Sequence, residues 1–334
     1  MTLRTLLLAT VTSVSALPAL ADVNIYTTRQ PELVQPVMDA FTAETGIGVN
    51  LAFVNDALIE RLKAEGARSP ADLVMTVDIA NMQRVVDSGT VQPVESEFLQ
   101  KAIPSNLRAV DNTWFALTTR ARIVYASKER VADGEITTYE DLADPKWKGR
   151  ICTRSGLHNY NLALLSAYIA HHGEEEAKVW AQGLKDNLAI KPKGGDREQV
   201  KSIWAGECDI SLGNTYYMGK MIADPEQSEW ANSVNIQFPT FEDGGTHVNI
   251  SGIAMAKSAP NREEALQLME FLVSADAQAI YAEANSEYPV LEGAPLSDLV
   301  DSWGDFTVDN IDLTEVSGHR AAALRIMEEV NFDG

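Results

Sequence analysis

Strand-like and helix-like segments alternate three times over residues 22–89, and this alternation constrains the fold more than any other feature. Short β-branched runs predict strands, and apolar residues repeated at three- and four-residue spacing predict the helices between them. In order, the segments are a strand at 23–26, a helix ending at Gly46, a strand at 49–54, a helix through Leu62, a strand at 72–76 and a helix ending at Gly89. This order predicts an α/β fold with a parallel, doubly wound sheet.

A second α/β series follows a long extended segment at 115–125. It includes strands near 151–153 and 208–212 and helices at 158–172, 174–187 and 197–205; extended chain at 246–257 and helices at 262–274 and 319–330 come later. We therefore expect two lobes joined by extended hinge strands, with a ligand cleft between them. The expected N-lobe comprises 22–118 and 243–291, and the expected C-lobe comprises 119–242 and 292–334.

The first 21 residues resemble a secretory signal peptide. Arg4 precedes a short apolar run at 6–8, and the segment ends in Ala19-Leu20-Ala21, which predicts cleavage before Asp22. No later segment reaches about 18 consecutive apolar residues, so we expect a soluble, exported protein of the bacterial periplasm.

Charge and composition exclude several classes of protein. The formal net charge of −21 argues against nucleic-acid binding, and the 45% hydrophobic content argues against a disordered acidic chain. Two cysteines are too few for zinc-finger or iron–sulfur frameworks. The sequence also has no P-loop, no dinucleotide glycine fingerprint and no G-x-S-x-G motif, so we expect no enzyme.

Several motifs resemble one family of transport proteins. Asp-Leu-Ala-Asp-Pro-Lys-Trp-Lys-Gly at 141–149 is similar to a segment of type II periplasmic binding proteins of ABC transporters. The remaining motifs resemble the periplasmic iron-binding proteins of the FutA/FbpA type: Tyr-Thr-Thr-Arg at 26–29, Thr-Arg-Ser at 153–155, Asn-Tyr-Asn at 159–161 and Gly-Asn-Thr-Tyr-Tyr at 213–217. The resemblance covers essentially the whole chain after the signal segment.

The resemblance implies that tyrosine phenolates bind iron, and the matching residues are Tyr26, Tyr160, Tyr216 and Tyr217. Fe3+ is a hard ion that prefers anionic oxygen ligands, so Fe3+ is the favoured ion, with Fe2+ left open. An ion held by all four would join Tyr26 of the N-lobe to the C-lobe tyrosines and favour closure.

Basic residues are expected around these tyrosines. The candidates are Arg29, Arg120 and Lys220, with Arg122 as the alternative to Arg120. Gln30 stands where many relatives have His, and we expect no ligand from it. We also expect none from His158, although it lies two residues before Tyr160.

Cys152 and Cys208 lie in or beside two predicted strands of the second lobe. Adjacent strands in an oxidising compartment favour a disulfide between them, and two buried free thiols are the alternative.

The sequence thus predicts a monomeric periplasmic protein that delivers iron to the permease of an inner-membrane ABC importer. One alternative is the same fold binding an organic solute such as a polyamine, thiamine or phosphonate. The other is a secreted α/β enzyme, for which the sequence offers no paired nucleophile and base.

Overall fold

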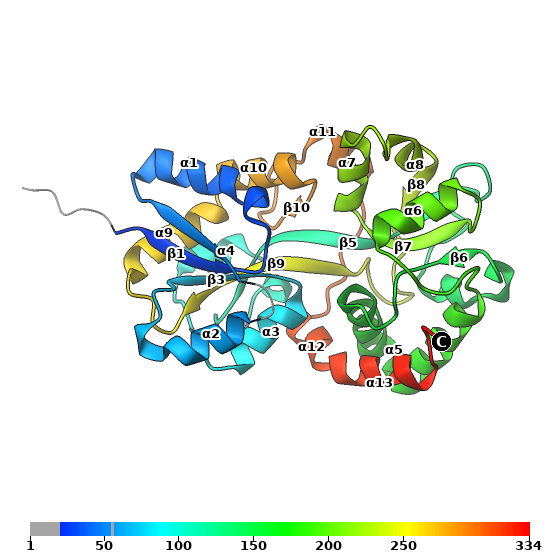
Figure 1. Ribbon diagram of the computed structural model, residues 1–334, viewed down its shortest axis with the longest axis horizontal. Helices are drawn as coiled ribbons and strands as arrows, with labels where there is room; N and C mark the ends of the chain where they lie inside the picture. Colours follow the sequence, from blue (N-terminus) through cyan, green and yellow to red (C-terminus); the bar gives the residue numbers. More distant parts are fainter. Residues whose placement is uncertain (1–20, 55–56) are drawn as a thin grey trace, which may run out of the picture.

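The computed structural model describes residues 21–54 and 57–334. One mixed sheet, with strand order β2-β1-β3-β9-β5-β7-β6, runs the length of the molecule, and helices cover it in two groups (Figure 1). This is the two-lobed α/β architecture expected from the sequence.

The N-lobe contains the three parallel strands of the first alternation, which is confirmed. β1 (Val23–Thr27) lies between β2 (Val49–Phe53) and β3 (Leu73–Val77) and pairs in parallel with both. The helices of this lobe are α1 (Gln35–Thr45), α2 (Leu58–Glu65), α3 (Ile79–Asp87), α4 (Glu97–Ala102), α9 (Arg262–Leu272) and α10 (Ala275–Asn285). α1 begins only at Gln35, because Pro31–Leu33 form a separate 3-10 turn before it.

Two long antiparallel strands connect the lobes. β5 (Phe115–Ser127) is buried along all 13 residues, and β9 (Val248–Ala256) is buried along all nine. β9 pairs with β3 and with the first half of β5, and the second half of β5 pairs with β7 (Ile210–Asn214) and β8 (Val234–Gln237). A continuous ladder of backbone hydrogen bonds therefore passes from one lobe to the other.

The C-lobe is built around β7. Its remaining strand is β6 (Ile151–Cys152), parallel to β7, and its helices are α5 (Asn159–Asp186), α6 (Asp196–Trp204), α7 (Tyr216–Ala223), α8 (Ser228–Asn232) and α13 (Arg320–Glu329). The two helices predicted at 158–172 and 174–187 form α5, which is broken at Gly173 (φ 81°, ψ 170°). Glycine adopts this left-handed conformation without the steric cost that a side chain would add.

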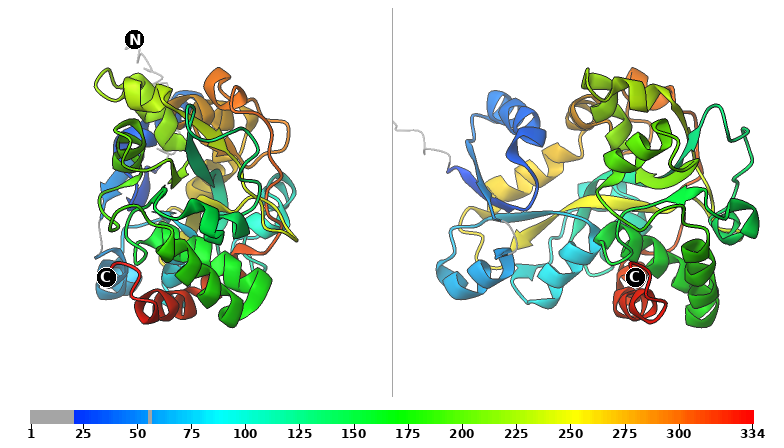
Figure 2. Two further views of the ribbon diagram at one scale, coloured as in Figure 1. Left: turned by 90° about the vertical axis from the view of Figure 1, so that its right-hand side faces the viewer. Right: turned by 45° about the vertical axis from the view of Figure 1, so that its right-hand side comes forward.

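Short elements complete the molecule. They are β4 (Val91–Gln92), β10 (Tyr288–Pro289), α11 (Asp298–Asp301) and α12 (Leu313–Gly318). β10 pairs with β5 beside the hinge, and the chain then crosses so that α12 and α13 pack on α5 (Figure 2).

Residues 1–20 of the expected signal segment lie outside the described residues, so cleavage before Asp22 stays a prediction. Within 21–54 and 57–334, no helix is both long and apolar enough to cross a membrane.

The expected disulfide between Cys152 and Cys208 is present. Cys152 ends β6 and Cys208 lies two residues before β7, so the bond fastens two neighbouring strands, and both side chains are buried.

We expect replacement of both cysteines by serine to lower the free energy of unfolding by about 4 kcal/mol, because the bond closes a loop of 56 residues in the unfolded chain. Denaturant titration of the oxidised protein and the double variant measures this difference. Two reactive thiols in unfolded, non-reduced protein exported to the periplasm would contradict the bond itself.

Candidate metal centre

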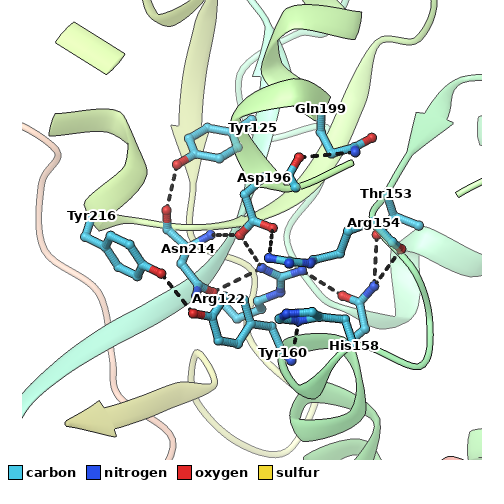
Figure 3. Close-up of polar contacts among 12 residues, drawn as sticks. Arg122, Tyr125, Thr153, Arg154, His158, Tyr160, Asp196, Gln199, Asn214 and Tyr216 are labelled. Carbon is cyan, nitrogen blue, oxygen red and sulfur yellow. Dashed lines mark hydrogen bonds and ion pairs between the residues drawn. The ribbon is translucent and has the colours of Figure 1, made fainter. Parts of the chain in front are cut away.

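Three of the four expected tyrosines meet at the ends of C-lobe elements. Tyr216 and Tyr217 begin α7, directly after β7, and Tyr160 lies in the first turn of α5. The hydroxyl oxygens of Tyr160 and Tyr216 are 3.1 Å apart (Figure 3). The ring centroids of Tyr216 and Tyr217 are 4.2 Å apart. Two hydroxyl oxygens therefore lie together, with the Tyr217 ring packed beside that of Tyr216.

The local sequence explains this placement. His158 caps α5, with its Nδ1 accepting a hydrogen bond from the Tyr160 backbone N–H at 3.2 Å, and its ring packs edge-on against the Tyr160 ring. Burial and the nearby Arg154 and Arg122 lower the pKa of His158 to about 4, so the ring is neutral near pH 7. The neutral ring both orients Tyr160 and starts its helix.

The cluster faces a cleft between the lobes. One cavity of about 480 Å³ is lined by Thr28, Gln30 and Val77 of the N-lobe and by the three tyrosines of the C-lobe. A smaller cavity of about 250 Å³, on the side of α3, shares Thr28, Val77 and Tyr160 with it. The two cavities are thus parts of one cleft.

Burial favours the protonated forms of Tyr216 and Tyr217 in this arrangement. Desolvation, with the neighbouring Tyr160 and Tyr217, raises the pKa of Tyr216 well above its usual value, whereas Arg120 acts in the opposite direction. Burial, Tyr160 and Asp196 raise the pKa of Tyr217 to about 12. A cation bound at the oxygens reverses this balance, because it favours the ionised ligand.

Tyrosine oxygens are the candidate ligands here. Among the residues that the structure describes, no group of three or more His, Cys, Asp or Glu side chains is placed to hold a metal ion. Three phenolates together would carry three negative charges, which matches a trivalent hard cation.

Tyr26 is not brought into this cluster. Its hydroxyl donates to the carboxylate of Glu65 at 2.9 and 3.0 Å, and Arg61 stacks over its ring at 4.1 Å. It is 2% exposed and is not among the residues described as lining either part of the cleft. The physical reason is that Tyr26 packs within β1 against α2 rather than extending past the end of the strand. In this arrangement Tyr26 lies apart from the three clustered tyrosines, and its role as the fourth ligand stays a prediction.

The expected basic residues occupy two different environments. Arg29 is buried in an ion pair with Glu287, with Nη2 and Oε2 2.7 Å apart, and both Arg29 and Arg120 donate to the Ser251 hydroxyl. Burial alone would raise the pKa of Glu287, but Arg29 and Arg120 outweigh it and hold that pKa below its usual value. Arg29 is therefore held mainly by its contacts with Glu287 and Ser251, although it also lines the cleft.

Lys220 lies closer to the tyrosines. Its Nζ is 5.7 Å from the centroid of the Tyr216 ring, and burial together with Arg29 lowers its pKa. Gln30 also lines the cleft, and His158 lines the smaller cavity.

The sequence analysis missed a buried network behind the tyrosines. Arg122 and Arg154 both donate to Asp196, at 2.8 and 3.0 Å, and Arg122 also donates to Asn161 and Asn214 (Figure 3). Arg154 belongs to a motif that the resemblance had already marked. Asp196 carried no usable signal among the 48 acidic residues of the chain.

Comparison with known proteins places the chain among transport proteins. The family model described as "Bacterial extracellular solute-binding protein" matches residues 68–308. The chain is 45% identical to Iron uptake protein A1 of Synechocystis sp., over 93% of this chain and 87% of that protein.

Solved structures agree with this match. Ferric iron-binding protein A of Mannheimia haemolytica, in an open conformation, superposes with a TM-score of 0.91 at 46% identity, covering 94% of this chain and 99% of the other. The Bordetella ferric binding protein superposes with a TM-score of 0.90 at 47% identity, covering 94% and 100%. The resemblance drawn from the sequence motifs is confirmed, and the chain belongs to the family of bacterial extracellular solute-binding proteins.

Proposed function

We propose that this protein binds ferric iron in its cleft and delivers it to an ABC importer. The observation that carries the proposal is the cluster of Tyr160, Tyr216 and Tyr217 at one wall of the cleft. Each phenolate is a hard anionic ligand, and three of them neutralise the charge of Fe3+. Arg120 and Lys220, beside Tyr216, supply positive charge that favours its ionised form.

The relatives support the choice of ligand. Iron uptake protein A1, the Mannheimia ferric iron-binding protein and a Trichodesmium FutA in complex with iron and citrate are all similar to this chain over 93–94% of its length. We propose Fe3+ as the cargo for that reason, and a binding protein rather than an enzyme.

The setting of this function follows from the same family. We propose a monomer in the periplasm, released by cleavage before Asp22, whose partner is an inner-membrane permease. We also propose lobe boundaries at 22–118 with 243–291 and at 119–242 with 292–334. The crossing of β5 and β9, and the packing of α13 on α5, support this division.

We expect Tyr216→Phe and Tyr217→Phe each to weaken iron binding at least tenfold, because each removes one anionic ligand while keeping the ring. Iron competition against a chelator measures the dissociation constant, and the visible phenolate-to-iron absorption reports the ligands directly. Tyr168→Phe is the matched control: it removes the hydroxyl of a buried C-lobe tyrosine whose ring stacks on Trp180 and does not line the cleft.

Wild-type affinity in both cluster variants would overturn the proposed site. Loss of affinity in Tyr26→Phe as well would support Tyr26 as the fourth ligand that the sequence predicts.

Iron affinity is expected to fall steeply as pH falls. Burial raises the pKa of Tyr216 and the pKa of Tyr217, the latter to about 12, so binding these two side chains as phenolates releases two protons. The dissociation constant then rises by about 100-fold per pH unit of acidification on account of these two groups, since each released proton contributes about tenfold. Competition titrations across pH 6–8 measure this slope. Tyr217→Phe is expected to reduce the slope by one proton, and an unchanged slope would exclude Tyr217 as an ionised ligand.

A further inference from the structure

One buried carboxylate connects the segments that carry the three clustered tyrosines. Asp196, the first residue of α6, is 1% exposed. Its Oδ2 accepts from Arg122 Nη1 at 2.8 Å and from the Asn214 backbone N–H at 3.0 Å, and its Oδ1 accepts from Arg154 Nη1 at 3.0 Å. Figure 3 shows the bonds from both guanidinium groups to the Asp196 carboxylate.

Each partner of Asp196 either packs on a tyrosine ring or lies close to a tyrosine in the sequence. Asn214 ends β7, two residues before Tyr216, so the hydrogen bond to its backbone fixes the start of the turn that presents Tyr216 and Tyr217. Arg154 lies over the Tyr160 ring, with its Cζ 5.0 Å from the ring centroid.

Arg122 supports the same ring from a second direction. Its Cζ is 5.8 Å from the Tyr160 ring centroid, and its Nη2 donates to Asn161, the next residue along α5, at 2.7 Å. The carboxylate thus joins β5, the loop at 153–158 and the end of β7 at one point.

Replacing this carboxylate with a neutral group would separate those segments. Two buried guanidinium groups repel one another unless a shared anion lies between them, and hydrogen bonds to ionised partners are the strong ones. Metal ligands need placement to a fraction of an ångström, so a small shift of Tyr160 relative to Tyr216 is enough to impair a shared site.

We propose that Asp196 is a positioning residue for iron binding, which sets the placement of Tyr160 relative to Tyr216 and Tyr217. It touches none of the tyrosine hydroxyls in the contacts described above and acts through Arg122, Arg154 and the Asn214 backbone. This inference rests on the proposed function.

The chain provides a matched control in Asp209. Its carboxylate also bridges two guanidinium groups in the same lobe, those of Arg130 (2.5 Å) and Arg150 (2.6 Å). It lies just before β7, at the end of that strand opposite to Asn214. Asp209→Asn therefore removes the same kind of bridge without touching the segments that carry the tyrosines.

The first experiment compares Asp196→Asn with Asp209→Asn in the full chain. We expect Asp196→Asn to raise the dissociation constant for Fe3+ at least tenfold and to shift the phenolate-to-iron absorption band, and Asp209→Asn to change neither. Thermal unfolding without iron separates these effects from stability, because a purely structural role lowers the melting temperature without moving the band. Folded Asp196→Asn with wild-type affinity and band position would overturn the proposal.

Arg154→Gln removes the guanidinium partner of the same Arg154–Asp196 hydrogen bond. It remains informative if Asp196→Asn does not fold. If Asp196 acted only through its charge, neutralising Asp196 and neutralising Arg154 would move iron affinity in opposite directions. Positioning predicts that both substitutions weaken binding and shift the band, and that the double variant is little worse than either single one. An Arg154→Gln protein with tighter or unchanged binding and an unchanged band would contradict it.

Measurements of iron binding by the wild-type protein distinguish a failure of the proposed function from a failure of the proposed role of Asp196. Absence of iron binding or of the absorption band in wild type would overturn the proposed function, whereas iron binding in wild type with unaffected Asp196→Asn overturns only the role of Asp196.

Discussion

The antiparallel pairing of β5 with β9 is the constraint on which the rest of the structure depends. β5 spans both lobes, so every side chain along it is buried against one lobe or the other. Arg120 and Arg122 lie two residues apart and therefore share a face of the strand. Arg120 reaches Ser251 and the network of Arg29 and Glu287, whereas Arg122 reaches Asp196 in the C-lobe. One strand thus supplies a buried cation to each side of the cleft.

Buried charges of this kind are costly unless each is paired, and the pairing is nearly symmetrical between the lobes. Glu287 accepts from Arg29 and Thr118 on one side, and Asp196 accepts from Arg122 and Arg154 on the other. Since a buried ion pair gives little net stability over apolar packing, its value here lies in fixing geometry. The C-lobe network directly adjoins the tyrosines, which is why its geometry matters for binding.

Sequence patterns predicted the fold well and the site in part. The alternation at 22–89 predicted the parallel strands, and the resemblance of the motif at 213–217 marked Tyr216 and Tyr217, which line the cleft. The surroundings of the Tyr26 side chain could not be predicted, because the pattern of β1 does not reveal its contacts with Arg61 and Glu65 on α2. Asp196 was equally hidden: its importance comes from partners at 122, 154 and 214, which only the folded chain brings together.

How closure relates to binding depends on whether Tyr26 joins the three clustered tyrosines. Without Tyr26, the three proposed ligands, Tyr160, Tyr216 and Tyr217, all lie on C-lobe elements and are in place whether or not the N-lobe approaches. The N-lobe contributes Thr28, Gln30 and Val77 to the opposite wall of the cleft, together with Glu287, whose carboxylate is already paired with Arg29. Closure would then act mainly by excluding water and strengthening the electrostatic interactions around the ion. A phenol cluster that must lose protons to bind can also regain them, so opening the cleft to water favours release as well as entry.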